Sequence, residues 1–99
     1  MKKRGQFHAL NVNGISTEKQ GLIFYICRCY ADLPQDKRNI LDSLFNRIGG
    51  TNEAALRAVM TTDESFVKIC LDYHIASHTT LVRLRNRFFA EFPLRELLR

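Results

Sequence analysis

The chain has 99 residues and a formal net charge of +5, and 45% of its residues are hydrophobic. This length is enough for one domain with one modest core, which excludes a multidomain enzyme. The longest uninterrupted apolar stretch, Leu22 to Cys27, is six residues long, whereas a membrane-spanning helix needs roughly 20. The basic start at residues 1–4 is not followed by the long apolar segment of a secretory signal. We therefore expect a cytoplasmic protein without a membrane span.

The basic charge is concentrated at the two ends of the sequence. Residues 1–4 contain three bases, residues 5–76 contain seven bases and eight acids, and residues 77–99 contain five arginines and two glutamates. Solvated surfaces normally mix the two signs, so separated basic blocks favour an anionic partner, of which nucleic acid is the commonest. A charge balance that serves solubility alone is the alternative.

The first third of the chain predicts an arm followed by a helix. Residues 1–15 contain two of the five glycines and no helical period, which is typical of a flexible basic arm. A first helix is expected from Ser16 or Thr17 to about Asp32, because Thr17 and Gln20 have the spacing of a capping box. Its centre is apolar on every side and rich in strand-forming residues, so a buried strand stays an alternative.

The middle of the chain predicts two further helices. Pro34 suits the first turn of a helix, and Gly49 followed by Gly50 is a typical helix end. The apolar positions between them recur at helical spacing along one stripe: Ile40, Leu41, Leu44, Phe45 and Ile48. A short third helix over residues 51–60 has one apolar face, made of Ala55, Leu56, Val59 and Met60.

The last third predicts two helices and a final turn. The fourth helix is expected to begin at Thr61 or Thr62, since Thr61 and Glu64 have capping-box spacing. Ser77 is expected to cap a fifth helix that Pro93 ends. The inward residues would be Phe66, Ile69, Cys70 and Tyr73 on the fourth helix and Leu81, Leu84, Phe88 and Phe92 on the fifth. The sequence thus predicts an all-α single domain of four or five helices over residues 16–99.

Residues 62–92 follow the pattern of a helix-turn-helix. A short helix, a turn with one apolar residue and a capped second helix occur in that order. Cys70 is small enough for the helices to cross closely, and Ile75 can fill the angle between them. The second helix would point a polar face outward, formed by Thr79, Arg83 and Arg87 with His78, Thr80 and Asn86 beside them.

Such a face has the chemistry of a DNA-reading helix. Arginine contacts guanine edges, asparagine pairs with adenine, and a helix N-terminus attracts phosphate. No acidic residue occurs from Ala76 to Ala90; an ordinary solvated amphipathic helix is the alternative. Arg85 adjoins the inward stripe and is expected to cover the core edge or to reach a phosphate. We predict that double-stranded DNA is contacted by Ser77, His78, Thr79, Thr80, Arg83, Asn86 and Arg87, with Lys2, Lys3 and Arg4 as phosphate or minor-groove contacts.

Three short motifs carry a family resemblance. Residues 69–77, ICLDYHIAS, resemble the I-A-x-x-L-G-I-S core of bacterial helix-turn-helix regulators, and residues 80–85, TLVRLR, are similar to their T-L-x-R-x-R recognition helices. Residues 33–41, LPQDKRNIL, resemble the L-P-x-x-x-R-x-V-L opening of the fourth, DNA-binding region of sigma factors. The chain departs from the pattern at His74, where the family has glycine. The resemblance implies a DNA-binding transcription regulator in a bacterial cell or a phage-infected host.

Metal binding and catalysis have little support in the sequence. Cys27 and Cys29 face nearly opposite ways on a helix, and His74 and His78 span the predicted turn, so we expect no zinc site. The three cysteines at unmatched spacing favour free buried thiols over disulfides. No nucleophile motif or glycine-rich phosphate loop is present. We therefore expect no enzyme and no cofactor.

A protein-binding role is the second hypothesis. In it the chain is a non-enzymatic inhibitor or adaptor that uses the basic C-terminal helix against an acidic protein partner, such as the transcription machinery. An apolar cluster near the C-terminus could serve as an interface patch, form a homodimer, or simply close the core. Its members are Phe89, Phe92, Leu94, Leu97 and Leu98.

Overall fold

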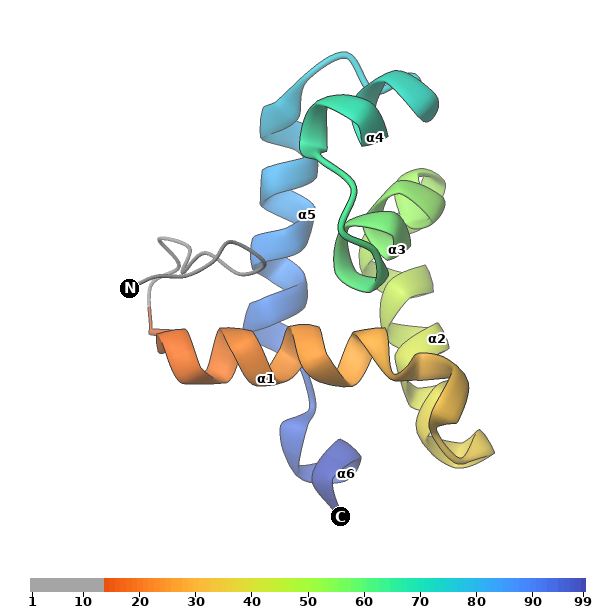
Figure 1. Cartoon of the computed structure of the whole chain (residues 1–99), viewed down its shortest axis with the longest axis vertical. Coiled ribbons are helices and arrows are strands. Elements are labelled where there is room, and N and C mark those ends of the chain that lie inside the picture. Colours follow the sequence, from red (N-terminus) through yellow and green to blue (C-terminus); the bar gives the residue numbers. More distant parts are fainter. Residues whose placement is uncertain (1–13) are drawn as a thin grey trace.

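Six α-helices and two short 3-10 helices follow one another in the computed structural model, which describes residues 14–99 (Figure 1). They are α1 (Thr17–Arg28), η1 (Tyr30–Asp32), α2 (Gln35–Gly49), η2 (Gly50–Asn52), α3 (Glu53–Thr61), α4 (Phe66–Asp72), α5 (His78–Glu91) and α6 (Leu94–Leu98). No strand occurs in residues 14–99, so the all-α prediction is confirmed and the strand alternative for the first element is wrong. Residues 1–13 of the expected N-terminal arm lie outside the described residues.

No helix within the described range combines the length and the apolar character that a bilayer crossing requires.

The start of α1 differs from the expected capping box. Ser16 is the N-cap, and its Oγ accepts a hydrogen bond from the Lys19 backbone N–H at 3.1 Å. Gln20 is 1% exposed, and its Nε2 donates to the Ile15 carbonyl at 3.1 Å. This buried side chain therefore holds the residue that precedes the N-cap against the helix. The helix ends at Arg28, before the expected end at about Asp32. The chain then forms η1 ahead of Pro34, because a proline disfavours helical backbone in the residue before it.

The expected end of α2 is confirmed, and its start lies one residue after Pro34, which the sequence predicts in the first turn. Pro34 is its N-cap, and the helix ends at Gly49. Gly50 has a φ of 52°, a conformation that glycine adopts without steric cost. A Cβ on Gly49 would lie 3.2 Å from the Glu53 Cβ, so the corner between α2 and α3 is tight. The inward residues of α2 are Leu41, Leu44, Phe45 and Ile48, with Ile40 packed partly buried against them.

Helix α3 lies at the centre of the packing. It contacts α1, α2, α4 and α5, and the predicted apolar face is buried. Aromatic pairs join the other elements around it: Phe45 of α2 stacks on Phe88 of α5 with ring centroids 4.7 Å apart, and Phe24 of α1 meets Phe89 edge-on at 5.4 Å. The core therefore fixes α5 against both α1 and α2.

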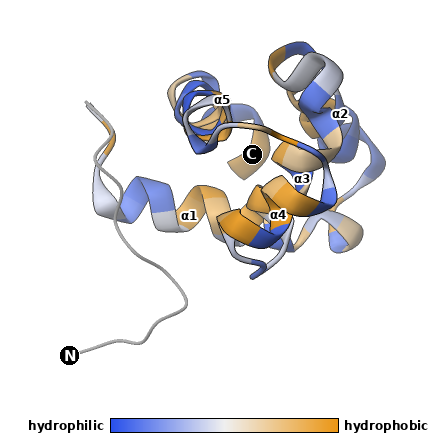
Figure 2. Ribbon diagram, turned by 90° about the horizontal axis from the view of Figure 1, so that it is seen from above, coloured by the Kyte–Doolittle hydropathy of each residue, from blue (hydrophilic) through white to orange (hydrophobic). Residues whose placement is uncertain are grey.

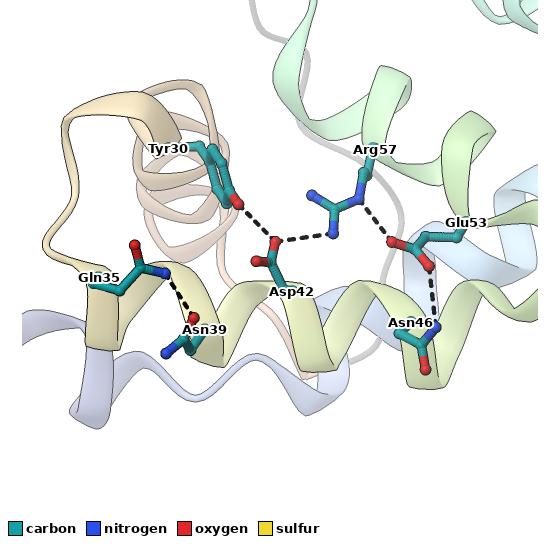
Figure 3. Close-up of polar contacts among 7 residues, drawn as sticks. All are labelled: Tyr30, Gln35, Asn39, Asp42, Asn46, Glu53 and Arg57. Atoms are coloured by element: carbon teal, nitrogen blue, oxygen red, sulfur yellow. Dashed lines mark hydrogen bonds and ion pairs between the residues drawn. The ribbon is translucent and has the colours of Figure 1, made fainter.

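A polar network joins η1, α2 and α3 beside this core (Figure 3). Arg57 donates from Nη2 to Asp42 at 2.9 Å and from Nε to Glu53 at 2.8 Å. The Tyr30 hydroxyl donates to the same Asp42 at 2.7 Å, and Asn46 donates to Glu53 at 3.2 Å. Asp42 thus accepts from η1 and from α3, and Glu53 accepts from α2 and from its own helix, so the network joins α2 to α3.

The network also shifts the pKa of both carboxyl groups. Arg57 holds the pKa of Glu53 below its ordinary value, since it donates to the charged form. Partial burial raises the pKa of Asp42, but the hydrogen bonds from Tyr30 and Arg57 outweigh it, and the net pKa is lowered. The guanidinium of Arg57 lies 4.7 Å from the ring centre of Phe45, so the same side chain packs on the core.

The C-terminal cluster closes the core. Residues 94–98 form the expected last helical turn, α6. The Lys37 ammonium donates to the backbone carbonyls of Glu96 at 2.9 Å and Arg99 at 2.8 Å, which fixes the end of α6 to α2. Phe89, Phe92 and Leu97 are buried and Leu94 packs against them, while Leu98 is exposed.

Candidate nucleic-acid interface

Helix α4 begins later than the sequence predicts. Ser65 is its N-cap, and the Ser65 Oγ accepts from the Lys68 backbone N–H at 3.1 Å. The expected start at Thr61 or Thr62 is wrong, because both hydroxyls donate to carbonyls of α3, each at 2.6 Å. These threonines therefore complete the end of α3, and a separate serine starts α4.

The turn between α4 and α5 is a Schellman motif. The Ile75 N–H donates to the Cys70 carbonyl at 2.8 Å, and the His74 N–H donates to the Leu71 carbonyl at 3.4 Å. His74 has a φ of 59°, a left-handed conformation that histidine adopts more readily than most residues. Ile75 packs half-buried against the core, as expected. The Ser77 Oγ then accepts from the Thr79 N–H at 3.2 Å, which confirms the predicted cap of α5.

Helix α5 has the predicted inward and outward faces. Leu81 and Phe88 are fully buried, and Leu84 packs half-buried against the core. The other predicted residues of α5 differ in how far they are exposed. His78, Thr79, Arg83 and Arg87 are exposed, and Thr80 and Asn86 are half-buried.

Two polar residues of α5 are held in a way that limits outside contacts. The Arg85 guanidinium lies 5.0 Å from the Phe66 ring centre, and burial lowers its pKa. Arg85 therefore covers the edge of the core, which is one of its two expected positions. The Asn86 side-chain oxygen is buried without a partner in residues 14–99. A bidentate contact with adenine needs that oxygen, so this conformation does not present it.

The remaining arginines of α5 differ in their partners. Arg83 makes no ion pair within the described part of the chain. Arg87 donates from Nε to Glu91 Oε2 at 3.2 Å, while Arg47 of α2 pairs with Glu91 Oε1. The bond from Arg47, helped by Arg87, holds the pKa of Glu91 below its ordinary value. The spacing of four residues indicates the Arg87–Glu91 pair, but nothing local in the sequence indicates Arg47.

An open groove of about 400 Å³ runs beside this ion pair, between α2 and the junction of α5 and α6. Its lining combines apolar side chains with hydroxyl, amide and charged groups. The lining residues are Asn39, Ile40, Ser43, Leu44, Arg47, Glu91 and Pro93.

The outer face of α4 exposes two apolar side chains beside charged ones. Val67 is 55% exposed and Leu71 is 71% exposed, and Figure 2 shows the hydrophobic colour along this helix. Tyr73, expected to point inward, is 43% exposed; it follows the last residue of α4, and its φ of −107° takes it off the helical path. Lys68 lies between two acids, 2.6 Å from Asp72 on the same helix and 3.4 Å from Glu64, which precedes the N-cap.

The other sequence-based expectations concern the N-terminus, metals and thiols. Lys2, Lys3 and Arg4 lie outside the described residues. In residues 14–99 no group of three or more histidine, cysteine or acidic side chains is arranged to hold a metal ion. All three cysteines are free, and burial raises the pKa of the Cys27 thiol to about 12.

Comparisons of this chain with protein-family models, curated proteins and solved structures give no match.

Proposed function

We propose that this protein is a small helix-turn-helix transcription regulator of bacterial or phage type that binds double-stranded DNA through α5. The observation that carries the proposal is the exposed row of Thr79, Arg83 and Arg87 on a capped helix that has no acid before Glu91. In this proposal α4 and the turn position α5, whose N-terminal half enters the major groove.

The residues of α5 take different roles in this proposal. Arg83 is exposed and unpaired in the described range, so it reads a base edge, for which guanine offers two acceptors. Thr79 and Thr80, with Ser77 and His78 before them, lie at the N-terminus of the helix, where the backbone favours phosphate. The basic residues Lys2, Lys3 and Arg4 add phosphate or minor-groove contacts. The proposal requires no catalysis and no cofactor.

A fluorescence-anisotropy titration with a mixed-sequence duplex tests the proposal. Binding should weaken steeply with salt, because each arginine on a phosphate releases counterions. Arg95→Ala is the matched control for Arg83→Ala, since both remove one exposed positive charge and Arg95 lies on α6. Arg83→Ala should weaken binding much more than Arg95→Ala. Absence of binding at low salt, or binding without salt dependence, would refute the proposal.

The outer face of α4 supports a second candidate, a non-enzymatic adaptor that places the basic face of α5 on an acidic protein. Contact with phosphate does not stabilise the exposed apolar side chains of Val67 and Leu71, whereas burial against a protein surface does. A pull-down after nuclease treatment separates the two candidates. The adaptor role predicts a stoichiometric acidic partner that both Leu71→Ser and Arg83→Ala lose, together with no affinity for the duplex.

A further inference from the structure

Two arginines from different helices hold one carboxylate at the end of the polar row of α5. Thr79, Arg83, Arg87 and Glu91 are each four residues apart, so they follow one another along one side of the helix. At the last position, Arg87 contacts one oxygen of Glu91, and Arg47 of α2 contacts the other. Glu91 thus interrupts a row that is otherwise free of acids.

We propose that Arg47 and Arg87 form a binding site for a backbone phosphate of the DNA, and that Glu91 occupies this site in the free protein. This inference rests on the proposed function. A carboxylate and a phosphodiester both present two charged oxygens, and arginine is the side chain best suited to hold such a pair. The carboxylate therefore marks where an external anion would be held.

An incoming phosphate can reach the site without unfolding the chain. The side chains of Arg47 and Arg87 are 57% and 56% exposed. Glu91 is the last residue of α5, and Arg47 and Glu91 both line the open groove beside α2. Exposed ion pairs contribute little stability, whereas a phosphate contact on duplex DNA also gains from counterion release. The exchange of Glu91 for phosphate is therefore favourable when the duplex is near.

The length of α5 matches this placement. Arg83 and Glu91 are separated by about 12 Å along the helix axis, which exceeds the depth of the major groove, about 8.5 Å. When Arg83 reaches base edges, the C-terminal end of α5 lies at the level of the phosphates that border the groove. The polar side chains of Asn39 and Ser43 line the same groove, so α2 would contribute to the contact as well.

Neutralising Glu91 tests the inference, because it should improve binding. We expect Glu91→Gln to raise the affinity for a mixed-sequence duplex by about threefold to tenfold, since two arginines are released. Arg47→Gln should lower the affinity and reduce the salt slope by about one. The matched control is Asp63→Asn, which makes the same change of charge and breaks the Arg28–Asp63 pair, neither residue of which lies on α5. Circular dichroism melts check that each variant folds.

The outcomes separate this inference from the proposed function. Tighter binding by Glu91→Gln, with little change for Asp63→Asn, supports the phosphate site. If the wild type binds DNA but Glu91→Gln binds no more tightly, or if Asp63→Asn improves binding equally, the site is wrong and the proposed function stands. If neither the wild type nor Glu91→Gln binds the duplex, both are wrong.

Discussion

Arg57 and Arg83 show how the same side chain serves structure in one region and a surface role in another. The guanidinium of Arg57 contacts two carboxylates and an aromatic ring, so its charge has partners within the fold. Arg83 is exposed and has no ion pair within residues 14–99. The comparison teaches that charge alone does not mark a binding residue; the number of internal partners distinguishes the two uses.

The largest expected effect is on the stability of the network around Arg57. Arg57→Met removes the donor to Asp42 and Glu53 and leaves two partly buried acceptors with fewer bonds, which should lower the free energy of unfolding by about 2 kcal/mol. Urea unfolding followed by circular dichroism measures this change. Lys68→Met, which removes an exposed cation between two acids, is the control and should have a much smaller effect. Equal effects of the two substitutions would contradict the structural role of Arg57.

DNA binding should depend on Arg83 and not on Arg57. Arg83→Ala should weaken binding to duplex DNA by on the order of tenfold, the effect expected of a base-contacting arginine, and should leave the melting temperature unchanged. Arg57→Met should leave the affinity of the folded protein unchanged. Titrations under conditions where both variants are folded measure this contrast. The comparison fails if Arg83→Ala unfolds the chain or binds like the wild type.

Acidification should weaken the Arg57 region selectively. The pKa values of Asp42 and Glu53 are lower in the folded protein than their ordinary values of 3.8 and 4.5. The stabilisation is therefore complete above the ordinary values and is lost as the pH falls through the lower, folded values. Urea unfolding from about pH 6 to 3 should show this loss in the wild type and much less of it in Arg57→Met. Parallel curves for the two proteins would argue against the network.

The smallest expected effect concerns Arg85, which lies on α5 but packs on Phe66. Arg85→Met keeps the apolar stem and removes a cation that contacts the ring, so it should reduce stability by about 0.5–1 kcal/mol. Its effect on DNA affinity should be smaller than that of Arg83→Ala, two residues away. A larger loss of affinity for Arg85→Met would mean that this arginine leaves the ring to reach DNA.

The sequence predicts those features that depend on neighbouring residues. The end of α2 at Gly49, the cap at Ser77 and the burial of Leu81 all follow from local spacing or backbone preference. Local patterns also fail where two residues compete for one role. Ser16 and Ser65 cap helices for which Thr17 and Thr61 have an equally good spacing, and only the geometry of the neighbouring chain decides between them.

The candidate site was predictable only along α5. The exposure of Arg83 and Arg87 follows from the helical period of the buried residues. The meeting of Arg47 with Glu91 joins residues 44 positions apart, and the contacts of Arg57 with Asp42 and Tyr30 likewise cross between elements. Such pairs depend on how helices pack, which no local spacing encodes.

A map of backbone amide shifts in the NMR spectrum during titration with a mixed-sequence duplex tests the central claim most directly. We expect the largest changes at the N-terminal half of α5, around Thr79 and Arg83, and little change around Arg57. Changes confined to the outer face of α4, around Val67 and Leu71, or no changes at low salt, would contradict the assignment of α5 as the DNA-binding helix.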